Sequence, residues 1–254
     1  MTTATGHRRR LTLGRIPFTA CRADPRFSYC RYVPERATAR SPLLVVVHGD
    51  RRTAEQYRNA LEHFAEAHGC IVLAPLFPVG VPRQGDPFTY KRLSGGGLRF
   101  DLVLLRMVEE AAARAGRFYL HGFSGGGQFA LRFHSLHPER LAGLSVGAPG
   151  RITLPDPTLP WPAGTADAAE RFGLTPSLEA ARAVPVHLTV GELDTRRPAR
   201  PPQLSRVEQT TGLYHRLRAL GVPATLEIVP GLGHDGFALL PAATGFLGGL
   251  MGAG

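Results

Sequence analysis

Short apolar runs recur along the chain, each separated from the next by a longer segment. The first, LLVVV at residues 43–47, contains no polar position, a pattern typical of a strand buried on both faces of a sheet. Upstream, residues 11–18 and 27–33 alternate apolar and polar positions, which predicts two strands at an antiparallel edge. Further buried strands are expected at residues 70–75, 117–121, 141–149, 184–192 and 224–230.

Most segments between these runs carry apolar residues at helical spacing. Leu98, Leu102 and Leu105, for example, lie three or four residues apart and would share one face of a helix. A T-x-x-Q sequence that begins at Thr53 predicts a capping box at an earlier helix start. The expected helices span 54–68, 98–115, 125–137 and 203–220, with a last one from 235 onward. This alternation of strands and helices predicts an α/β fold with a mainly parallel central sheet and helices on both faces.

Three segments depart from the alternation. Residues 1–10 hold a basic patch without periodicity and are expected to be disordered, and residues 76–97 are rich in Pro and Gly, which predicts a long loop. Residues 150–183 are interpreted as a cap-like insertion over the carboxyl ends of the strands, where it would contribute to a substrate pocket. The whole chain, 1–254, is expected to form a single domain.

Composition and charge narrow the classes of function. The 254 residues are 43% hydrophobic and carry a formal net charge of +10. The arginines are spread along the chain instead of clustered, which argues against nucleic-acid binding. No apolar segment follows the basic patch, so no secretory signal is expected and the protein is assigned to the cytoplasm. The uncharged stretch 237–254 contains Pro241 and several glycines, which favours a helix packed on the core over a membrane span.

The three cysteines lack the spacing of a disulfide framework or a zinc site, and we expect free thiols and no bound metal. They are Cys21, Cys30 and Cys70.

A glycine-rich stretch, HGFSGGGQ, joins the strand at 117–121 to the following helix. It lacks the Lys and Ser/Thr of a phosphate-binding loop, and it has a serine where a dinucleotide-binding motif needs its second glycine. It does match G-x-S-x-G, with Ser124 between a strand and a helix. In that context a tight turn presents the serine hydroxyl as a nucleophile, and the N–H of Gly125 faces a developing oxyanion.

A serine nucleophile needs a base, and the base needs an acid that orients it. Asp194 and His234 each follow a predicted strand, in the order that this architecture requires, so both are expected at the same sheet edge as Ser124. Glu192 and Asp235 are rival acids, but the first overlaps the strand and the second directly follows the base. Histidines with other expected places are His187 inside a strand, His215 on a helix, and His134 and His137 near a helix end at surface-like spacing.

The second oxyanion donor is expected in the loop after residues 43–47, which begins with His48. The backbone N–H of Asp50 is the favoured donor, with Gly49 and Arg51 as alternatives. A carboxylate at this position would oppose the oxyanion unless it points away or is paired, and we expect a pair with Arg51 or Arg52. His48 itself is interpreted as a structural, hydrogen-bonding residue.

These motifs resemble the α/β-hydrolase superfamily from LLVVVHGD to GLGHDG, nearly the whole chain. VLAPLFP, HGFSGGGQFALRFHSLHPERL and VGELDT are similar to bacterial esterases related to dienelactone hydrolases and polyhydroxybutyrate-depolymerase-like esterases. The resemblance implies a carboxylic ester hydrolase without a cofactor, acting on a small-molecule ester or thioester with Ser124, Asp194 and His234 as its triad. A thioesterase, peptidase or acyltransferase would use the same triad, and a non-catalytic binding protein of this fold is a further alternative. Candidates for the acyl pocket are Phe77, Phe123 and Trp161.

Overall fold

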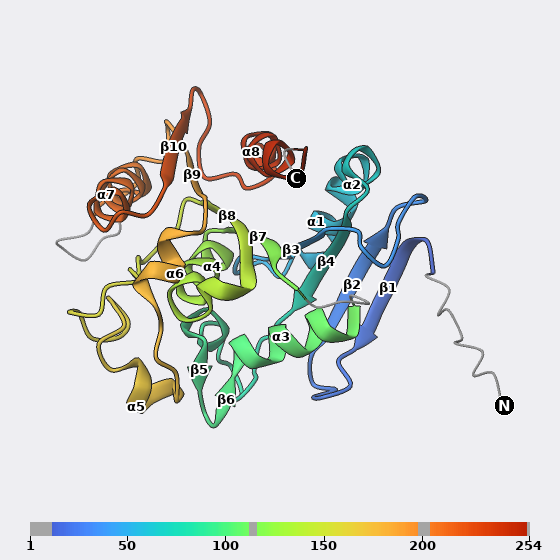
Figure 1. Ribbon diagram of the computed structural model, residues 1–254, viewed down its shortest axis with the longest axis horizontal. Helices are drawn as coiled ribbons and strands as arrows, with labels where there is room; N and C mark the ends of the chain where they lie inside the picture. Colours follow the sequence, from blue (N-terminus) through green and yellow to red (C-terminus); the bar gives the residue numbers. More distant parts are fainter. Residues whose placement is uncertain (1–11, 112–115, 198–203, 253–254) are drawn as a thin grey trace, which may run out of the picture.

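The computed structural model describes residues 12–111, 116–197 and 204–252, so the expected disorder of residues 1–10 lies outside the described chain. Eight strands form one sheet in the order β1-β2-β4-β3-β7-β8-β9-β10 (Figure 1). Neighbours from β4 to β10 run parallel, whereas β2 is antiparallel to both β1 and β4. The predicted mainly parallel sheet with an antiparallel edge is therefore confirmed.

The strands of this sheet are β1 (Gly14–Ala20), β2 (Ser28–Val33), β3 (Leu43–Val47), β4 (Ile71–Leu76), β7 (Phe118–Phe123), β8 (Leu141–Gly147), β9 (Val186–Gly191) and β10 (Ala224–Val229). The expected loop at 76–97 carries a short 3₁₀ helix, η1 (Thr89–Arg92), and β5 (Ser94–Gly95), which pairs with β6 (Leu98–Arg99) in a small separate hairpin.

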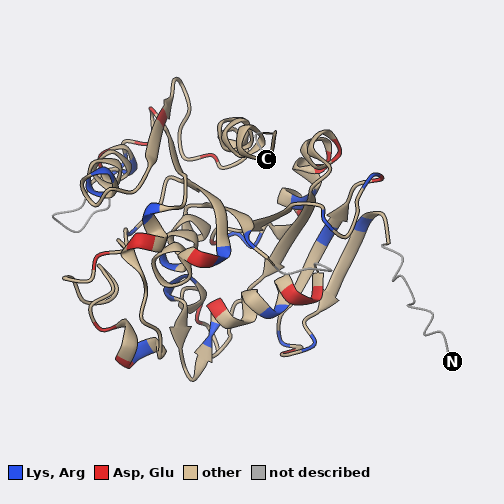
Figure 2. Ribbon diagram, viewed as in Figure 1, with Lys and Arg blue, Asp and Glu red and all other residues tan. Residues whose placement is uncertain are grey.

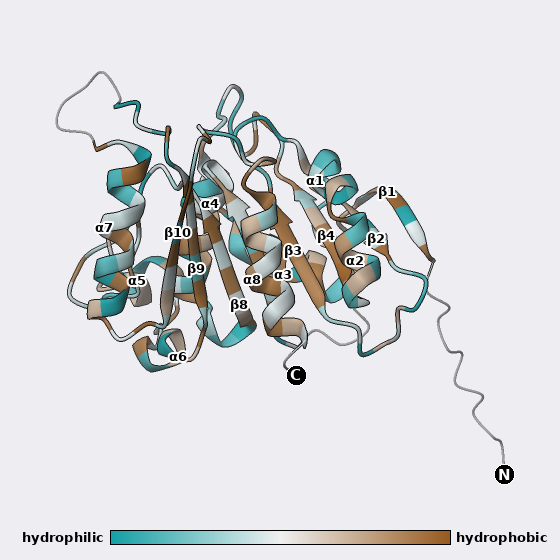
Figure 3. Ribbon diagram, turned by 90° about the horizontal axis from the view of Figure 1, so that it is seen from above, coloured by the Kyte–Doolittle hydropathy of each residue, from teal (hydrophilic) through white to brown (hydrophobic). Residues whose placement is uncertain are grey.

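Helices pack on both faces of the sheet, and the alternation within β3 shows how both faces are filled. Val45 and Val47 belong to the core layer shared with α3, α4 and α7, whereas Leu44 and Val46 face the layer shared with α1, α2 and α8. Strand β3, at the centre of the sheet, is accordingly apolar at every position (Figure 3). The helices are α1 (Ala54–Ala60), α2 (Glu62–His68), α3 (Phe100–Ala111), α4 (Gly125–Leu136), α5 (Ala168–Phe172), α6 (Leu178–Arg182), α7 (Arg206–Ala219) and α8 (Leu240–Gly252), with a second 3₁₀ helix, η2 (Pro138–Arg140).

Two helices begin or continue differently from the prediction. The single helix expected at 54–68 is divided into α1 and α2 at Leu61, whose ψ of 4° is not helical. The capping box at Thr53 is wrong, because this residue is not in the extended conformation that an N-cap needs and its side chain caps nothing. The last helix begins at Leu240 instead of 235, because the carboxylate of Asp235 accepts hydrogen bonds from the N–H groups of Phe237 and Ala238 and holds a turn there.

The C-terminal helix, α8, is part of the packed fold. Helix α8 packs on the core through Leu240, Ala243 and Leu247. None of the described helices is long and apolar enough to cross a bilayer. The three cysteines are free thiols, as predicted, and all three are buried.

Helix α4 is buried along its whole length because η1, α6 and the start of the 150–183 segment pack around it. The expectation that His134 and His137 lie on a surface is therefore wrong. His137 Nε2 donates a hydrogen bond of 2.8 Å to the buried carboxylate of Asp101, which also accepts two hydrogen bonds from Arg99. Burial disfavours the charged forms of His137 and Asp101. The hydrogen bonds outweigh it, raising the pKa of His137 and lowering that of Asp101.

We expect Asp101→Asn to lower the free energy of unfolding by about 3 kcal/mol, since it leaves Arg99 and His137 without their buried counter-charge. The carboxylate contributes stability above its ordinary pKa of 3.8, and the imidazolium contributes below its ordinary pKa of 6.5. The loss, measured by urea denaturation, should therefore be largest between those pH values and smaller once the pH passes the raised pKa of His137.

The matched control is Glu109→Gln on the same helix, α3, which removes a solvent-exposed pair with Arg106. It should cost less than about 1 kcal/mol at any pH. Equal losses for the two variants would contradict the importance of the buried pair.

Candidate active site

Ser124 lies in a strained turn between β7 and α4. Its φ of 54° and ψ of −110° are rare for a residue with a side chain, and its N–H donates a 2.8 Å hydrogen bond to Gly147 O in β8. A Cβ on Gly126 would lie 2.0 Å from Val47 O, and one on Gly122 would lie 2.2 Å from Gly126 O. Both glycines are required because the helix start is pressed against β3 and against its own preceding strand.

We expect Gly126→Ala to destabilise the protein by several kcal/mol, on the order of a severe overpacking mutation, and to displace Ser124. The comparison is Gly245→Ala in α8, where a new Cβ meets no atom within 4 Å and should stabilise by about 0.5–1 kcal/mol. Thermal unfolding of both variants checks the difference, and an unchanged melting temperature for Gly126→Ala would contradict the close approach.

Asp194 and His234 meet at the same sheet edge as Ser124. His234 Nδ1 lies 2.5 Å from Asp194 Oδ2, and His234 Nε2 lies 3.0 Å from Ser124 Oγ. If Nδ1–H donates to the carboxylate, Nε2 is free to accept the serine proton. The loops after β9 and β10 hold this pair together through a 2.8 Å hydrogen bond from Leu193 N–H to Leu232 O. Asp194 is buried, whereas the His234 ring is partly open to solvent.

Both rival acids have other partners. Glu192 accepts a hydrogen bond from Gly231 N–H and so braces the loop after β10. Asp235 caps the turn before α8. Of the three acids considered, the structure brings Asp194 to His234.

The loop after β3 lies directly beside Ser124. A Cβ on Gly49 would be 3.8 Å from Ser124 Cβ and 3.9 Å from Gly125 N. Among the described residues, the backbone N–H groups of Asp50 and Gly125 have no hydrogen-bond partner. One of these unpaired donors belongs to the loop beside Ser124, and the other to the residue that follows Ser124.

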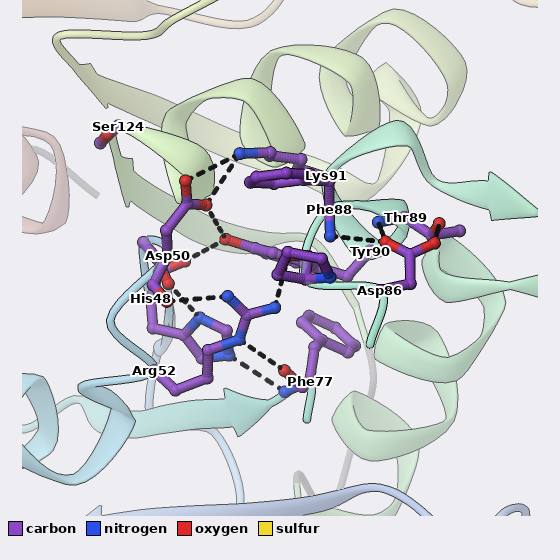
Figure 4. A network of polar contacts seen from close by, with 12 residues as sticks. His48, Asp50, Arg52, Phe77, Asp86, Phe88, Thr89, Tyr90, Lys91 and Ser124 are labelled. Atoms are coloured by element: carbon purple, nitrogen blue, oxygen red, sulfur yellow. Dashed lines mark hydrogen bonds and ion pairs between the residues drawn. The ribbon is translucent and has the colours of Figure 1, made fainter. Parts of the chain in front are cut away.

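The Asp50 carboxylate is paired, but not with the expected arginines. Lys91 Nζ, from η1, donates to its two oxygens at 2.8 and 2.9 Å, and the Tyr90 hydroxyl lies 3.4 Å from Oδ1 (Figure 4). The Arg52 guanidinium instead donates to backbone carbonyls, including that of Asp50. The expected pair with Arg51 or Arg52 is wrong because the 76–97 loop folds back and delivers the single lysine of the chain.

His48 has the structural role that the sequence suggested. Its Nε2 accepts a 3.0 Å hydrogen bond from Phe77 N–H, and its Nδ1 lies 2.8 Å from Gly49 O. Full burial lowers its pKa to about 4, so the ring is neutral at pH 7. The residue thus ties the loop after β4 to the loop beside Ser124 (Figure 4).

A cavity of about 480 Å³ opens onto Ser124 and His234. Phe123 lines it as predicted, 4.6 Å from the His234 ring between centroids. Tyr57 and Phe237, stacked at 4.5 Å, form an apolar wall that the sequence did not single out. Tyr57 was recognisable only as one apolar position of a helix. The complete lining is Gly49, Asp50, Arg51, Thr53, Tyr57, Phe123, Ser124, His234, Asp235, Gly236 and Phe237.

Two pocket candidates lie elsewhere. Phe77, the residue directly after β4, is fully buried and packs among aromatic rings of the core such as Phe129. Trp161 packs edge-on against Phe172 at 4.7 Å and lines a different cavity. No residue of the 150–183 segment lines the Ser124 cavity, so the expected contribution of this segment to that pocket is wrong.

Within the described residues, no cluster of three or more His, Cys, Asp or Glu side chains is arranged to hold a metal ion.

No protein-family model matches the chain, and no curated protein matches it. Among solved structures, it is similar to a poly(aspartic acid) hydrolase from Sphingomonas sp. KT-1, with 20% identity and a TM-score of 0.72 over 92% of this chain and 98% of that one. A poly(3-hydroxybutyrate) depolymerase from Bordetella parapertussis has 23% identity and a TM-score of 0.66 over 87% and 83%. An S-formylglutathione hydrolase from Staphylococcus aureus has 16% identity and a TM-score of 0.60 over 89% and 90%.

At these identities the likeness concerns the fold. The chain has the α/β-hydrolase fold of these esterase-type proteins, as the sequence predicted.

Proposed function

We propose that the protein is a serine hydrolase that cleaves carboxylic esters of small molecules through an acyl-enzyme intermediate. The observation that carries the proposal is the continuous line of contacts from Asp194 through His234 to Ser124, which opens into a cavity. The names of the similar structures, a depolymerase and two hydrolases, support the same class of reaction.

In the first half of the proposed reaction, Ser124 Oγ attacks the ester carbonyl carbon and its proton passes to His234 Nε2. The buried Asp194 carboxylate stabilises the imidazolium that forms. The tetrahedral intermediate places its oxyanion against the N–H groups of Gly125 and Asp50. Collapse breaks the bond to the alkoxide oxygen, which takes the proton from His234 and leaves as the alcohol.

The second half repeats this chemistry with water. His234 removes a proton from a water molecule, which attacks the acyl carbon bound to Ser124. The second tetrahedral intermediate then collapses, Ser124 Oγ regains the proton from His234, and the carboxylic acid is released. The partial solvent exposure of His234 supports this step, since water must reach its Nε2.

We expect Ser124→Ala and His234→Gln each to reduce hydrolysis of p-nitrophenyl butyrate by about 10⁴-fold or more in kcat. The double variant should be no slower than either single variant, because the residues act as one unit. The control His215→Gln, an exposed position on α7, should keep wild-type kinetics. Wild-type activity in Ser124→Ala would contradict the proposal.

Labelling with a fluorophosphonate probe, followed by mass spectrometry, separates catalysis from mere ligand binding. The wild type should be modified at Ser124, and His234→Gln should be modified far more slowly. Rates on matched butyryl ester, thioester and amide substrates then identify the preferred bond. A preference for the thioester or the amide would replace the esterase assignment by a thioesterase or a peptidase.

The charge of Asp50 provides a separate test of the oxyanion site. Lys91→Met leaves this carboxylate unpaired beside the developing negative charge, and we expect kcat to fall by about tenfold. Adding Asp50→Asn removes the repulsion while keeping the backbone donor, so the double variant should regain most of the loss. Equal activity of Lys91→Met and the wild type would indicate that the oxyanion forms away from Asp50.

A further inference from the structure

A second cavity, of about 720 Å³, lies on the other side of the Asp50–Lys91 pair. Six of its lining residues are Lys or Arg and none is Asp or Glu. Basic residues also occur on many other elements of the described fold (Figure 2), so the number of basic residues does not by itself mark a binding site. The lining residues are Phe88, Lys91, Arg92, Ser94, Gln128, Arg132, Gly150, Arg151, Trp161, Pro162, Arg171 and Arg206.

Arg132, from α4, forms the buried base of this cavity. Its side chain is 2% exposed, yet it contacts no carboxylate among the described residues. Nε donates to Thr153 Oγ1 at 3.2 Å and Nη1 donates to Lys91 O. A buried charge without a counter-ion costs several kcal/mol, on the order of the desolvation of the ion. An anion in the cavity would supply the missing counter-charge.

The pKa of Arg132 also reflects the absence of a counter-ion. Burial, and then the positive charges of Arg92 and Arg151, lower its pKa to about 10. The group is still charged at pH 7.

Two further arginines have capacity left for a ligand. Arg206, at the first turn of α7, donates only to Gly150 O, at 3.2 Å, among the described residues. Arg151 is exposed and has no hydrogen-bond partner among them. Arg171, by contrast, is already paired with Asp167. Guanidinium groups match the paired oxygens of carboxylates and phosphates, so the free donors favour an oxyanionic ligand.

The second cavity lies close to Ser124 along α4. Gln128, which lines it, is one turn along α4 from Ser124, about 6 Å along the helix axis. Asp50 lines the Ser124 cavity while its partner Lys91 lines this one, so the pair forms the boundary between them.

We propose that the second cavity binds a carboxylate or phosphate group of the substrate, at a distance from the bond that Ser124 attacks. Arg132 and Arg206 contact this carboxylate or phosphate group, and Arg151 attracts it to the opening of the cavity. The protein would accordingly act on esters that carry an acidic group. This rests on the proposed function for the ester, whereas the anion site itself does not depend on turnover.

Binding is tested by calorimetry on Ser124→Ala with two probes, suberate for a carboxylate and inorganic phosphate. We expect at least one to bind, and the tighter one identifies the group. The double variant Arg151→Gln/Arg206→Gln should weaken that binding by about tenfold or more. A loss of this size corresponds to about one charge-assisted hydrogen bond. Arg218→Gln, exposed at the far end of α7, is the matched control and should leave binding unchanged. Absence of binding by both probes, or equal affinity in all variants, would overturn the proposal.

Turnover gives the second readout, with ester pairs that differ only in a terminal carboxylate or methyl group. The pairs are the p-nitrophenyl monoesters of glutarate and valerate, and of suberate and octanoate. In at least one pair, the wild type should have a lower KM for the acidic ester, and added salt should remove the preference. Arg206→Gln should reduce the ratio of kcat/KM for the acidic over the neutral ester by about tenfold.

The two proposals fail in different ways. If no ester is cleaved but anion binding still depends on Arg206, the esterase proposal is wrong and the anion site stands. If the neutral esters are cleaved while neither anion binds and no acidic ester is preferred, the esterase stands and the anion site is overturned.

Discussion

The close approach of the β7–α4 turn to β3 is the constraint on which the site depends. Gly126 lies so near the carbonyls of Val47 and His48 that no side chain fits, and this contact leaves Ser124 in a backbone conformation that few residues adopt. The strained conformation is held by the two strands on either side of β7, because Ser124 N–H donates a hydrogen bond to β8 and Gly126 packs directly against β3. The serine hydroxyl is thus aimed by the centre of the sheet and not by a mobile loop.

The parallel arrangement of the strands brings the remaining groups to the same place. Loops at the carboxyl ends of β3, β7, β9 and β10 meet at one edge, although Ser124 and His234 are 110 positions apart in the chain. A hydrogen bond between the last two loops sets the distance between Asp194 and His234. The arrangement of Ser124, Asp194 and His234 therefore does not depend on contacts with the 150–183 segment.

Electrostatics connect this edge to the rest of the molecule. The Asp50 carboxylate, which would oppose a developing oxyanion, is neutralised by Lys91 from a loop that crosses to α4. The carbonyl of the same lysine accepts a hydrogen bond from the buried Arg132. One residue of the 76–97 loop therefore couples the Ser124 cavity to the basic cavity, and this loop, more than the 150–183 segment, shapes the surroundings of the serine.

The sequence by itself determined where the strands of the sheet lie along the chain, the G-x-S-x-G turn, and the positions of Asp194 and His234 directly after strands. Strands buried on both faces, helices and tight turns each have a local sequence pattern: an apolar run, apolar residues at helical spacing, or a glycine-rich motif. Only the tertiary structure decided that α4 is buried together with His134 and His137, that Phe77 belongs to the core, and that Lys91 pairs with Asp50. Each of these depends on how a segment without periodicity, the loop at 76–97 or the stretch after β8, folds back over the sheet. No local pattern encodes that path, since it follows from contacts between residues far apart in the chain.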